Sequence, residues 1–165
     1  MGSGAFPLIR LQEATMYQSI LVPVDGSEHS AKALGVAAQL ARGSSASLIL
    51  LTVAEYPPGN MGLFTGGMPE PFTADNWNDI ADSLKADADD ALQKVRDAVD
   101  LSGLEVESVV RQGMPAETIL HEASQRGVDA IVMGSRGISD MHGMIFGSTS
   151  HKVSHVAECS VITVA

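Results

Sequence analysis

The sequence is poor in several residue types, and each shortage narrows what the chain can be. One cysteine occurs in 165 residues, so no disulfide can form within the chain. Lysine and arginine number 10 against 20 acidic residues, for a net charge of −10. Such a surface repels a polyanionic backbone, which makes nucleic acid an unexpected partner. No apolar run approaches the ~20 residues of a membrane-spanning helix, so we expect no membrane partner and a cytoplasmic, reducing location.

The composition that remains is that of one folded domain. Hydrophobic residues form 45% of the chain and aromatic residues 4%, so the core is expected to consist of Val, Ile, Leu and Ala. A length of 165 residues against roughly 150 per domain leaves room for one domain and a short appendage. Residues 1–16 are interpreted as a tag or an N-terminal extension, and 17–165 as the domain.

Short β-branched runs alternate with runs of helical period along the domain, which predicts a parallel sheet with helices on both faces. The expected strands are Ser19–Val24, Ser47–Ala54, Leu104–Arg111, Asp129–Gly134 and Ser160–Val164. The expected helices are Ser27–Arg42 with Gly43 after its end, about Asn76–Leu101, one from Pro115 to a stop at Gly127, and one from near Ser148 with Val153, Val156 and Ala157 facing inward.

The strand sequences also predict the order of the sheet. The first and fourth strands are apolar on both faces, as central strands are, whereas Glu105 and Glu107 place the third at an edge. With right-handed crossovers the simplest order is 3-2-1-4-5, an open α/β sheet in which ligands bind at the carboxyl ends of the first and fourth strands. Pro23 favours strands that separate at this point, although a bulge without a ligand would explain it equally well.

Glycines follow the fourth strand in a pattern that suits an anion. Gly134-Ser135-Arg136-Gly137 is followed by nine residues and then by Gly147-Ser148-Thr149 at the start of a helix. Glycines let backbone N–H groups approach a phosphate, and a helix N-terminus attracts one. The alternative is ordinary turn chemistry. Neither a Walker motif nor a dinucleotide-binding glycine motif is present.

The segment Val22-Pro23-Val24-Asp25-Gly26-Ser27, together with Gly134-x-x-Gly137-x9-Gly147-Ser148, resembles the ATP-binding branch of the universal stress protein family. The resemblance covers residues 17–165 and implies a Rossmann-like fold that binds ATP, or ADP or AMP, with Mg²⁺ or Mn²⁺. Cys159-Ser160 departs from the family's usual Cys-Pro at the last strand.

The resemblance also implies roles for individual residues. Asp25 would lie near the ribose and phosphates and help to hold the metal, Val53 would contact the adenine, and Met133 would flank the nucleotide. The end of the first strand would contribute Pro23 and Val24. The phosphates would be held by Gly134, Arg136, Gly137, Gly147, Ser148 and Thr149.

Several of these residues have a simpler interpretation. Asp25 before Gly and Ser is ordinary turn and cap chemistry, and Arg136 could be a solvated loop residue. His151 and His155 have a spacing that can hold zinc, but surface histidines are the commoner case. Cys159 is expected to be buried and inert. The Glu55–Asp75 loop could be a lid, or could pack on its own domain.

The leading hypothesis is a soluble ATP-binding universal stress protein that acts in a stress response or in signalling, through a nucleotide-dependent conformation or a downstream protein partner not identified by the sequence. One alternative is a slow ATPase or phosphotransferase, with Arg136 and Lys152 as nearby cations and no evident catalytic residue. Another is a dimeric interaction module that needs no ligand. The apolar last strand at an exposed edge predicts a homodimer through this strand.

Overall fold

The computed structural model describes residues 17–55, 74–137 and 147–165, without the side chains of 74–78 and 80. The expectations for residues 1–16, for most of the Glu55–Asp75 loop, for Ile80 and for the nine residues before Gly147 lie outside these ranges. Within them, no helix is long and apolar enough to cross a membrane.

A five-stranded parallel sheet forms the centre of the molecule, in the order β3-β2-β1-β4-β5. The prediction of an open sheet in the order 3-2-1-4-5 is confirmed. The strands are β1 (Ser19–Pro23), β2 (Ser47–Ala54), β3 (Val106–Gln112), β4 (Ala130–Gly134) and β5 (Ser160–Val164).

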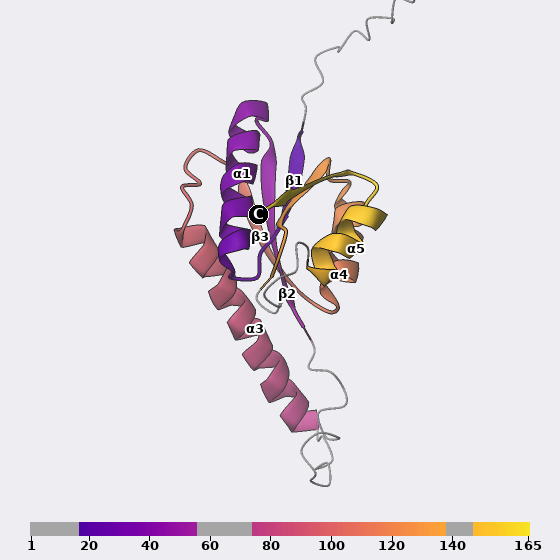
Figure 1. Cartoon of the computed structure of the whole chain (residues 1–165). Coiled ribbons are helices and arrows are strands. Elements are labelled where there is room, and N and C mark those ends of the chain that lie inside the picture. Colours follow the sequence, from indigo (N-terminus) through magenta and orange to yellow (C-terminus); the bar gives the residue numbers. More distant parts are fainter. Residues whose placement is uncertain (1–16, 56–73, 138–146) are drawn as a thin grey trace, which may run out of the picture.

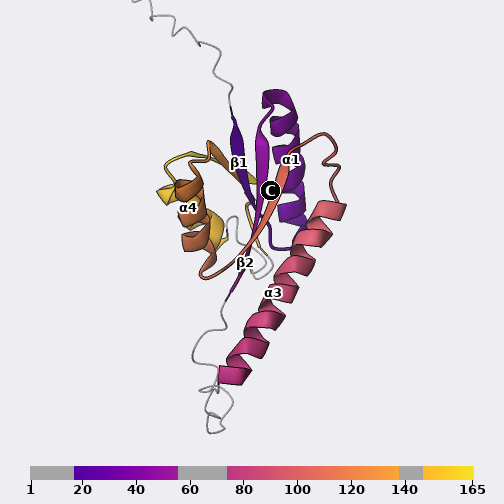
Figure 2. The ribbon, with the colours of Figure 1, turned by 180° about the vertical axis from the view of Figure 1, so that it is seen from behind.

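Helices cover both faces of this sheet, as a Rossmann-like α/β fold requires (Figures 1 and 2). Helices α1 (Glu28–Ser44) and α3 (Ala74–Asp97) lie on one face, and α4 (Pro115–Arg126) and α5 (Ser148–Val156) lie on the other. Each face has its own apolar core. Leu48 and Leu50 of β2 pack with the small residues of α1, whereas Ile49 and Leu51 pack with Ile119 of α4.

The start of α1 was predicted correctly and its end was not. Ser27 is the N-cap, and its hydroxyl accepts a hydrogen bond from Ser30 N at 3.1 Å. The prediction that Gly43 ends the helix is wrong, because Gly43 lies inside it and Ser45 takes the left-handed conformation, with φ 58°. The backbone N–H of Ser45 bonds to Ala41 O, which satisfies a carbonyl of the last turn without a glycine.

Other boundaries move by a few residues. Strand β3 begins at Val106 rather than Leu104, and α3 ends at Asp97 rather than Leu101. The expectation that Val156 faces inward is wrong: its side chain is 56% exposed, whereas Val153 of the same helix is fully buried. The last turn keeps its regular bond from Ala157 N to Val153 O at 3.0 Å, and Ala157 rather than Val156 packs beside Val153 on the core of this face.

Strands β1 and β4 pair over a short length only. Their register joins Ile20 to Ala130 and Leu21 to Ile131, whereas β1 stays paired with β2 as far as Pro23 and Leu51. The expectation that the neighbouring strand has already separated at Pro23 is therefore confirmed. Proline has no N–H, so Pro23 could not donate a ladder hydrogen bond to β4. The separation of β1 from β4 opens a crevice at the carboxyl edge of the sheet.

A charged network ties β3 to α4 on the outside of the sheet. Glu122 is 7% exposed and accepts hydrogen bonds from Arg111 Nε at 2.6 Å and from Arg126 Nε at 3.0 Å. Arg126 also binds both carboxylate oxygens of Glu107, at 2.9 and 3.0 Å. Burial by itself would raise the pKa of Glu122, but the bonds from Arg111 and Arg126 outweigh it and hold that pKa below its usual value.

This network makes stability depend on pH. A carboxylate whose folded pKa is depressed stabilises the protein above its unfolded pKa and loses this contribution as the pH falls toward the folded value. We expect Glu122→Gln to lower the free energy of unfolding by about 1–3 kcal/mol near pH 7, because it removes the buried carboxylate that pairs with two partly exposed arginines. The difference from wild type should shrink as the pH falls from about 5 to about 3.

Urea unfolding across this pH range measures the effect. Glu117→Gln is the matched control, since Glu117 pairs with Lys152 at 3.1 Å on an exposed surface and should change stability by less than about 1 kcal/mol. Equal losses in the two variants, or a loss for Glu122→Gln that does not depend on pH, would contradict this account.

Candidate functional site

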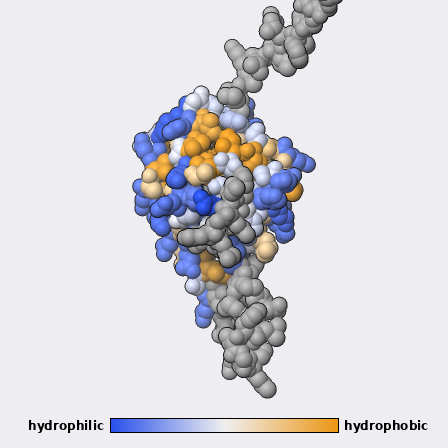
Figure 3. Space-filling model, viewed as in Figure 1, coloured by the Kyte–Doolittle hydropathy of each residue, from blue (hydrophilic) through white to orange (hydrophobic). Residues whose placement is uncertain are grey.

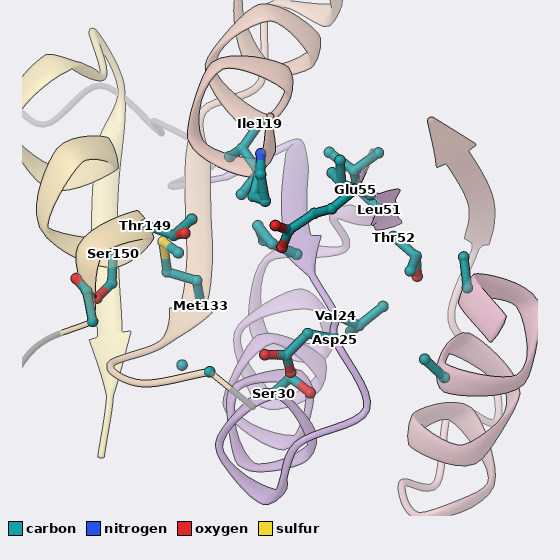
Figure 4. A pocket seen from close by; sticks show the side chains of 18 of the residues that line it. Val24, Asp25, Ser30, Leu51, Thr52, Glu55, Ile119, Met133, Thr149 and Ser150 are labelled. Carbon is teal, nitrogen blue, oxygen red and sulfur yellow. Dashed lines mark hydrogen bonds between the residues drawn. The ribbon is translucent and has the colours of Figure 1, made fainter. Parts of the chain in front are cut away.

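A cavity of about 470 Å³ opens at the carboxyl edge of the sheet, where β1 and β4 separate (Figure 4). Every residue that the sequence assigned to the site lines it. These residues are Pro23, Val24, Asp25, Val53, Met133, Gly134, Arg136, Gly137, Gly147, Ser148 and Thr149. The structure thus brings together residues from the ends of three strands and from the start of α5.

Part of the loop after β4 is held by its own hydrogen bonds. The carbonyl of Ser135 accepts from Gly147 N at 2.8 Å and from the buried hydroxyl of Ser150 at 2.7 Å, while Ser135 N donates to Val164 O at 2.7 Å. The amides of Ser135 and Gly147 are therefore already used within the protein. These bonds fix Ser135 against α5 and β5, so anion binding is left to the neighbouring groups.

The start of α5 offers such groups. Its N-cap is Gly147, which has no side chain to cap the helix. The first backbone bond of the helix that the structure gives runs from His151 N to Gly147 O at 3.0 Å. The first N–H groups of an uncapped helix have no intrahelical acceptor and carry the positive end of its dipole. Ser148 and Thr149 place these groups, and their hydroxyls, at the cavity wall.

Arg136 supplies positive charge to the same wall. Its Nε atom is buried and has no hydrogen-bond partner among the described residues. A buried, unpaired guanidinium N–H is unfavourable unless an acceptor is supplied, and an anionic ligand would supply one. Lys152, the other cation suggested by the sequence, instead pairs with Glu117 and is not among the lining residues. Arg136 is the one Lys, Arg or His that lines the cavity within the described ranges.

Three carboxylates line the cavity against this one arginine: Asp25, Glu55 and Asp87. Figure 4 shows the carboxylates of Asp25 and Glu55 turned into the cavity, toward the side of Met133. One oxygen of Asp25 also accepts from Ser27 N at 3.0 Å. The turn interpretation of Asp25 and its place at the cavity are both correct, because the turn holds the carboxylate at the wall.

A divalent cation bound in the cavity would need ligands from a nucleotide as well as from the described side chains. No group of three or more His, Cys, Asp or Glu side chains in the described ranges is placed to hold a metal by itself. Mg²⁺ typically takes one or two carboxylates and completes its shell with phosphate oxygens and water. Asp25 beside an anion site fits this requirement, and the assignment of metal binding to Asp25 stays a prediction.

A close contact with His29 leaves no room for a side chain at Gly134, apart from any approach of its backbone to a phosphate. A Cβ atom at this position would lie 2.8 Å from His29 Cβ and 3.0 Å from the backbone carbon of His29. The start of α1 therefore packs directly on the end of β4. This contact holds together the two elements that flank the crevice, so Gly134 shapes the site even before any ligand is considered.

Sequence reasoning missed half of the cavity wall. The further lining residues are Ser30, Leu51, Thr52, Ala54, Glu55, Leu84, Asp87, Ala88, Ala91, Pro115, Ile119 and Ser150. Those on β2 could have been inferred from the position of Val53 at the end of the same strand. Those on α3 could not, because its sequence reads as a helix with a solvated face and does not indicate where it crosses β2.

The remaining candidates fall outside the cavity. The rings of His151 and His155 stack with centroids 4.3 Å apart, and His155 Nδ1 lies 2.9 Å from His151 O, as expected for surface histidines. The Cys159 thiol is half-buried, and burial raises its pKa, which agrees with an inert thiol.

The fold and the cavity define a class: a doubly wound α/β protein with a cavity at the point where the winding of its sheet reverses. The sequence model of the universal stress protein family matches residues 16–165. The chain belongs to this family.

Individual relatives agree with this assignment. The chain is 36% identical over 151 residues to the universal stress protein YxiE of Bacillus subtilis, covering 90% of this chain and 99% of the relative. The solved structure of the universal stress protein UspA from Lactobacillus plantarum is 27% identical, with a TM-score of 0.72, and covers 90% of this chain and 98% of its own. A universal stress protein solved in complex with cAMP is 24% identical, with a TM-score of 0.60 and coverage of 91% and 98%, which shows a common fold.

The close contact at Gly134 can be tested by adding one methyl group. We expect Gly134→Ala to lower the free energy of unfolding by about 1–3 kcal/mol, because the new Cβ would overlap both the side chain and the backbone of His29. Gly35→Ala is the control: no atom lies within 4 Å of the added Cβ, and alanine favours the helix by up to about 1 kcal/mol. Denaturant unfolding of both variants measures the effect. A Gly134→Ala variant as stable as wild type would contradict the close contact with His29.

Proposed function

We propose that the protein is an adenine-nucleotide-binding universal stress protein, which holds ATP, or ADP or AMP, together with Mg²⁺ or Mn²⁺ in the cavity between β1 and β4. One observation carries the proposal. The cavity combines the uncapped start of α5 with a buried arginine N–H that has no acceptor among the described residues. The family relative in complex with cAMP supports an adenine-containing ligand.

The charges of the wall support a metal-bound nucleotide over a free one. Asp25, Glu55 and Asp87 would repel a polyphosphate, and Arg136 is the one cationic side chain among the described lining residues that would attract it. A divalent cation between the phosphates and Asp25 removes this repulsion. In this arrangement Arg136 and the N–H groups of Ser148 and Thr149 bind the phosphates, and the carboxylate of Asp25 positions the metal.

The role that follows is a nucleotide-dependent conformation that a downstream protein partner recognises. The loop between β4 and α5 is the segment through which occupancy would act, since Ser135 links it to both α5 and the end of β5. A cytoplasmic location is part of the proposal and is supported by the single cysteine and its half-buried thiol.

Calorimetry with ATP in the presence and absence of Mg²⁺ tests the proposal. We expect Mg²⁺-dependent binding to wild type, and an affinity at least about tenfold lower for Arg136→Gln, which removes a charge-assisted bond to phosphate. Arg42→Gln is the matched control, because Arg42 binds Asp100 at the far end of α1 and should leave the affinity unchanged. No heat of binding for wild type with ATP, ADP or AMP would refute the proposal.

We further propose a homodimer formed through the free edge of β5. Val161, Ile162 and Val164 are half-buried, and one side of the strand has no neighbouring strand in the sheet. Figure 3 shows apolar surface on the face of the molecule that carries the C-terminus. A two-fold axis would pair the two edge strands and cover these side chains.

The mass in solution tests the dimer. We expect twice the chain mass of 17.2 kDa at micromolar concentration, and dissociation in Ile162→Lys, which places a charge in the paired surface. Val156→Lys serves as the control, because Val156 is exposed and lies on α5 rather than on the edge strand itself. A monomeric wild type, or a dimer that dissociates equally in both variants, would contradict pairing through β5.

A further inference from the structure

Thr52 carries a buried hydroxyl that the protein itself does not use. The residue is 3% exposed, and its Oγ1 atom has no hydrogen-bond partner among the described residues. A valine has the same shape without the unsatisfied group, and the neighbouring strand positions are apolar. Thr52 also lines the cavity. Its hydroxyl is therefore unexplained by packing among the described residues, and it belongs to a residue of the cavity wall.

The position along β2 settles which part of the cavity Thr52 faces. Alternate residues of a strand point to opposite faces, and Leu48 and Leu50 belong to the core beneath α1 and α3. Thr52 continues this series, so its side chain lies on the α3 side of the sheet. There the cavity is also lined by Leu84, Asp87 and Ala88 of α3. No hydrogen bond fixes the Thr52 rotamer, and rotation about χ1 can exchange its methyl and hydroxyl toward the cavity.

This side of the cavity lies opposite the phosphate-binding groups. Figure 4 shows Thr52 on one side and Thr149 and Ser150 on the other. In the sheet, β1 lies between β4 and β2, so the end of β1 separates the phosphate-binding side of the cavity from the Thr52 side. A nucleotide whose phosphates lie at the start of α5 would cross the end of β1 and bring its base to β2.

We propose that Thr52 is a specificity-determining residue that recognises the base of the bound nucleotide. The inference rests on the proposed function and adds a residue and a selectivity to it. Asp87 of α3 lines the same side of the cavity as Thr52, and its carboxylate accepts hydrogen bonds when ionised. A base edge that donates hydrogen bonds therefore suits the Thr52 side of the cavity better than an edge that accepts them. The Thr52 hydroxyl thus accepts a hydrogen bond from an exocyclic amino group, which favours adenine over hypoxanthine.

Binding of ATP and of inosine triphosphate to wild type, Thr52→Val and Thr52→Ser tests this role. We expect wild type and Thr52→Ser to prefer ATP. Thr52→Val should bind ATP about tenfold more weakly and inosine triphosphate unchanged, because inosine has a carbonyl where adenine has the amino group. Thr163→Val, on β5 and outside the cavity lining, controls for loss of a strand hydroxyl.

The thermal midpoint of the nucleotide-free protein gives an independent readout. Thr52→Val should raise it by about 2 °C or more, since the substitution removes an unsatisfied buried group. A lower affinity of Thr52→Val for ATP together with a higher thermal midpoint would indicate that the hydroxyl binds the ligand and does not stabilise the fold. A lower midpoint would show that the hydroxyl already has a partner within the protein and would overturn the inference.

The outcomes separate this inference from the function on which it rests. If wild type binds no adenine nucleotide, the proposed function fails, and the inference fails with it. If wild type binds ATP and Thr52→Val binds it equally well, or loses ATP and inosine triphosphate to the same extent, only the base-recognition role of Thr52 is wrong.

Discussion

The early separation of β1 from β4 is the constraint on which the rest of the structure depends. Pairing between these strands ends at Leu21, while each continues along its other neighbour. Because parallel strands are otherwise closely spaced, only such a separation leaves room for a ligand at the carboxyl edge. The glycine loop, the start of α5 and the end of β2 all converge on this opening.

The charges around the opening explain why a nucleotide and a metal are considered together. The wall provides acceptors in excess and a single guanidinium among the described residues, on a chain whose net charge is −10. A polyphosphate alone would meet repulsion from Asp25 and its neighbours, and a metal alone would find too few ligands. Under the proposed function the two together would satisfy both sets of groups, and nucleotide binding would then require the cation.

The strand order and the glycine loop could be predicted from patterns in the sequence, whereas the places of Val53 and Met133 at the site were implied by the family resemblance. Apolar strands, edge glutamates and handed crossovers left one simple order, and the glycine spacing marked one loop. Helix ends were less predictable: a left-handed Ser45 replaced the expected Gly43, because one backbone bond was enough to end α1. The α3 side of the cavity was missed, since the crossing of a long helix over β2 depends on tertiary packing. The buried hydroxyl of Thr52 likewise has meaning only once its missing partner can be seen.

Backbone amide shifts on addition of ATP and Mg²⁺ to the isotope-labelled protein test the central claim most directly. The account predicts that the largest shifts occur at Arg136, Ser148 and Thr149, with smaller shifts at the end of β2 and none near Gly127 at the opposite edge of the sheet. Absence of shifts at saturating nucleotide, or shifts confined to residues outside the cavity, would contradict it.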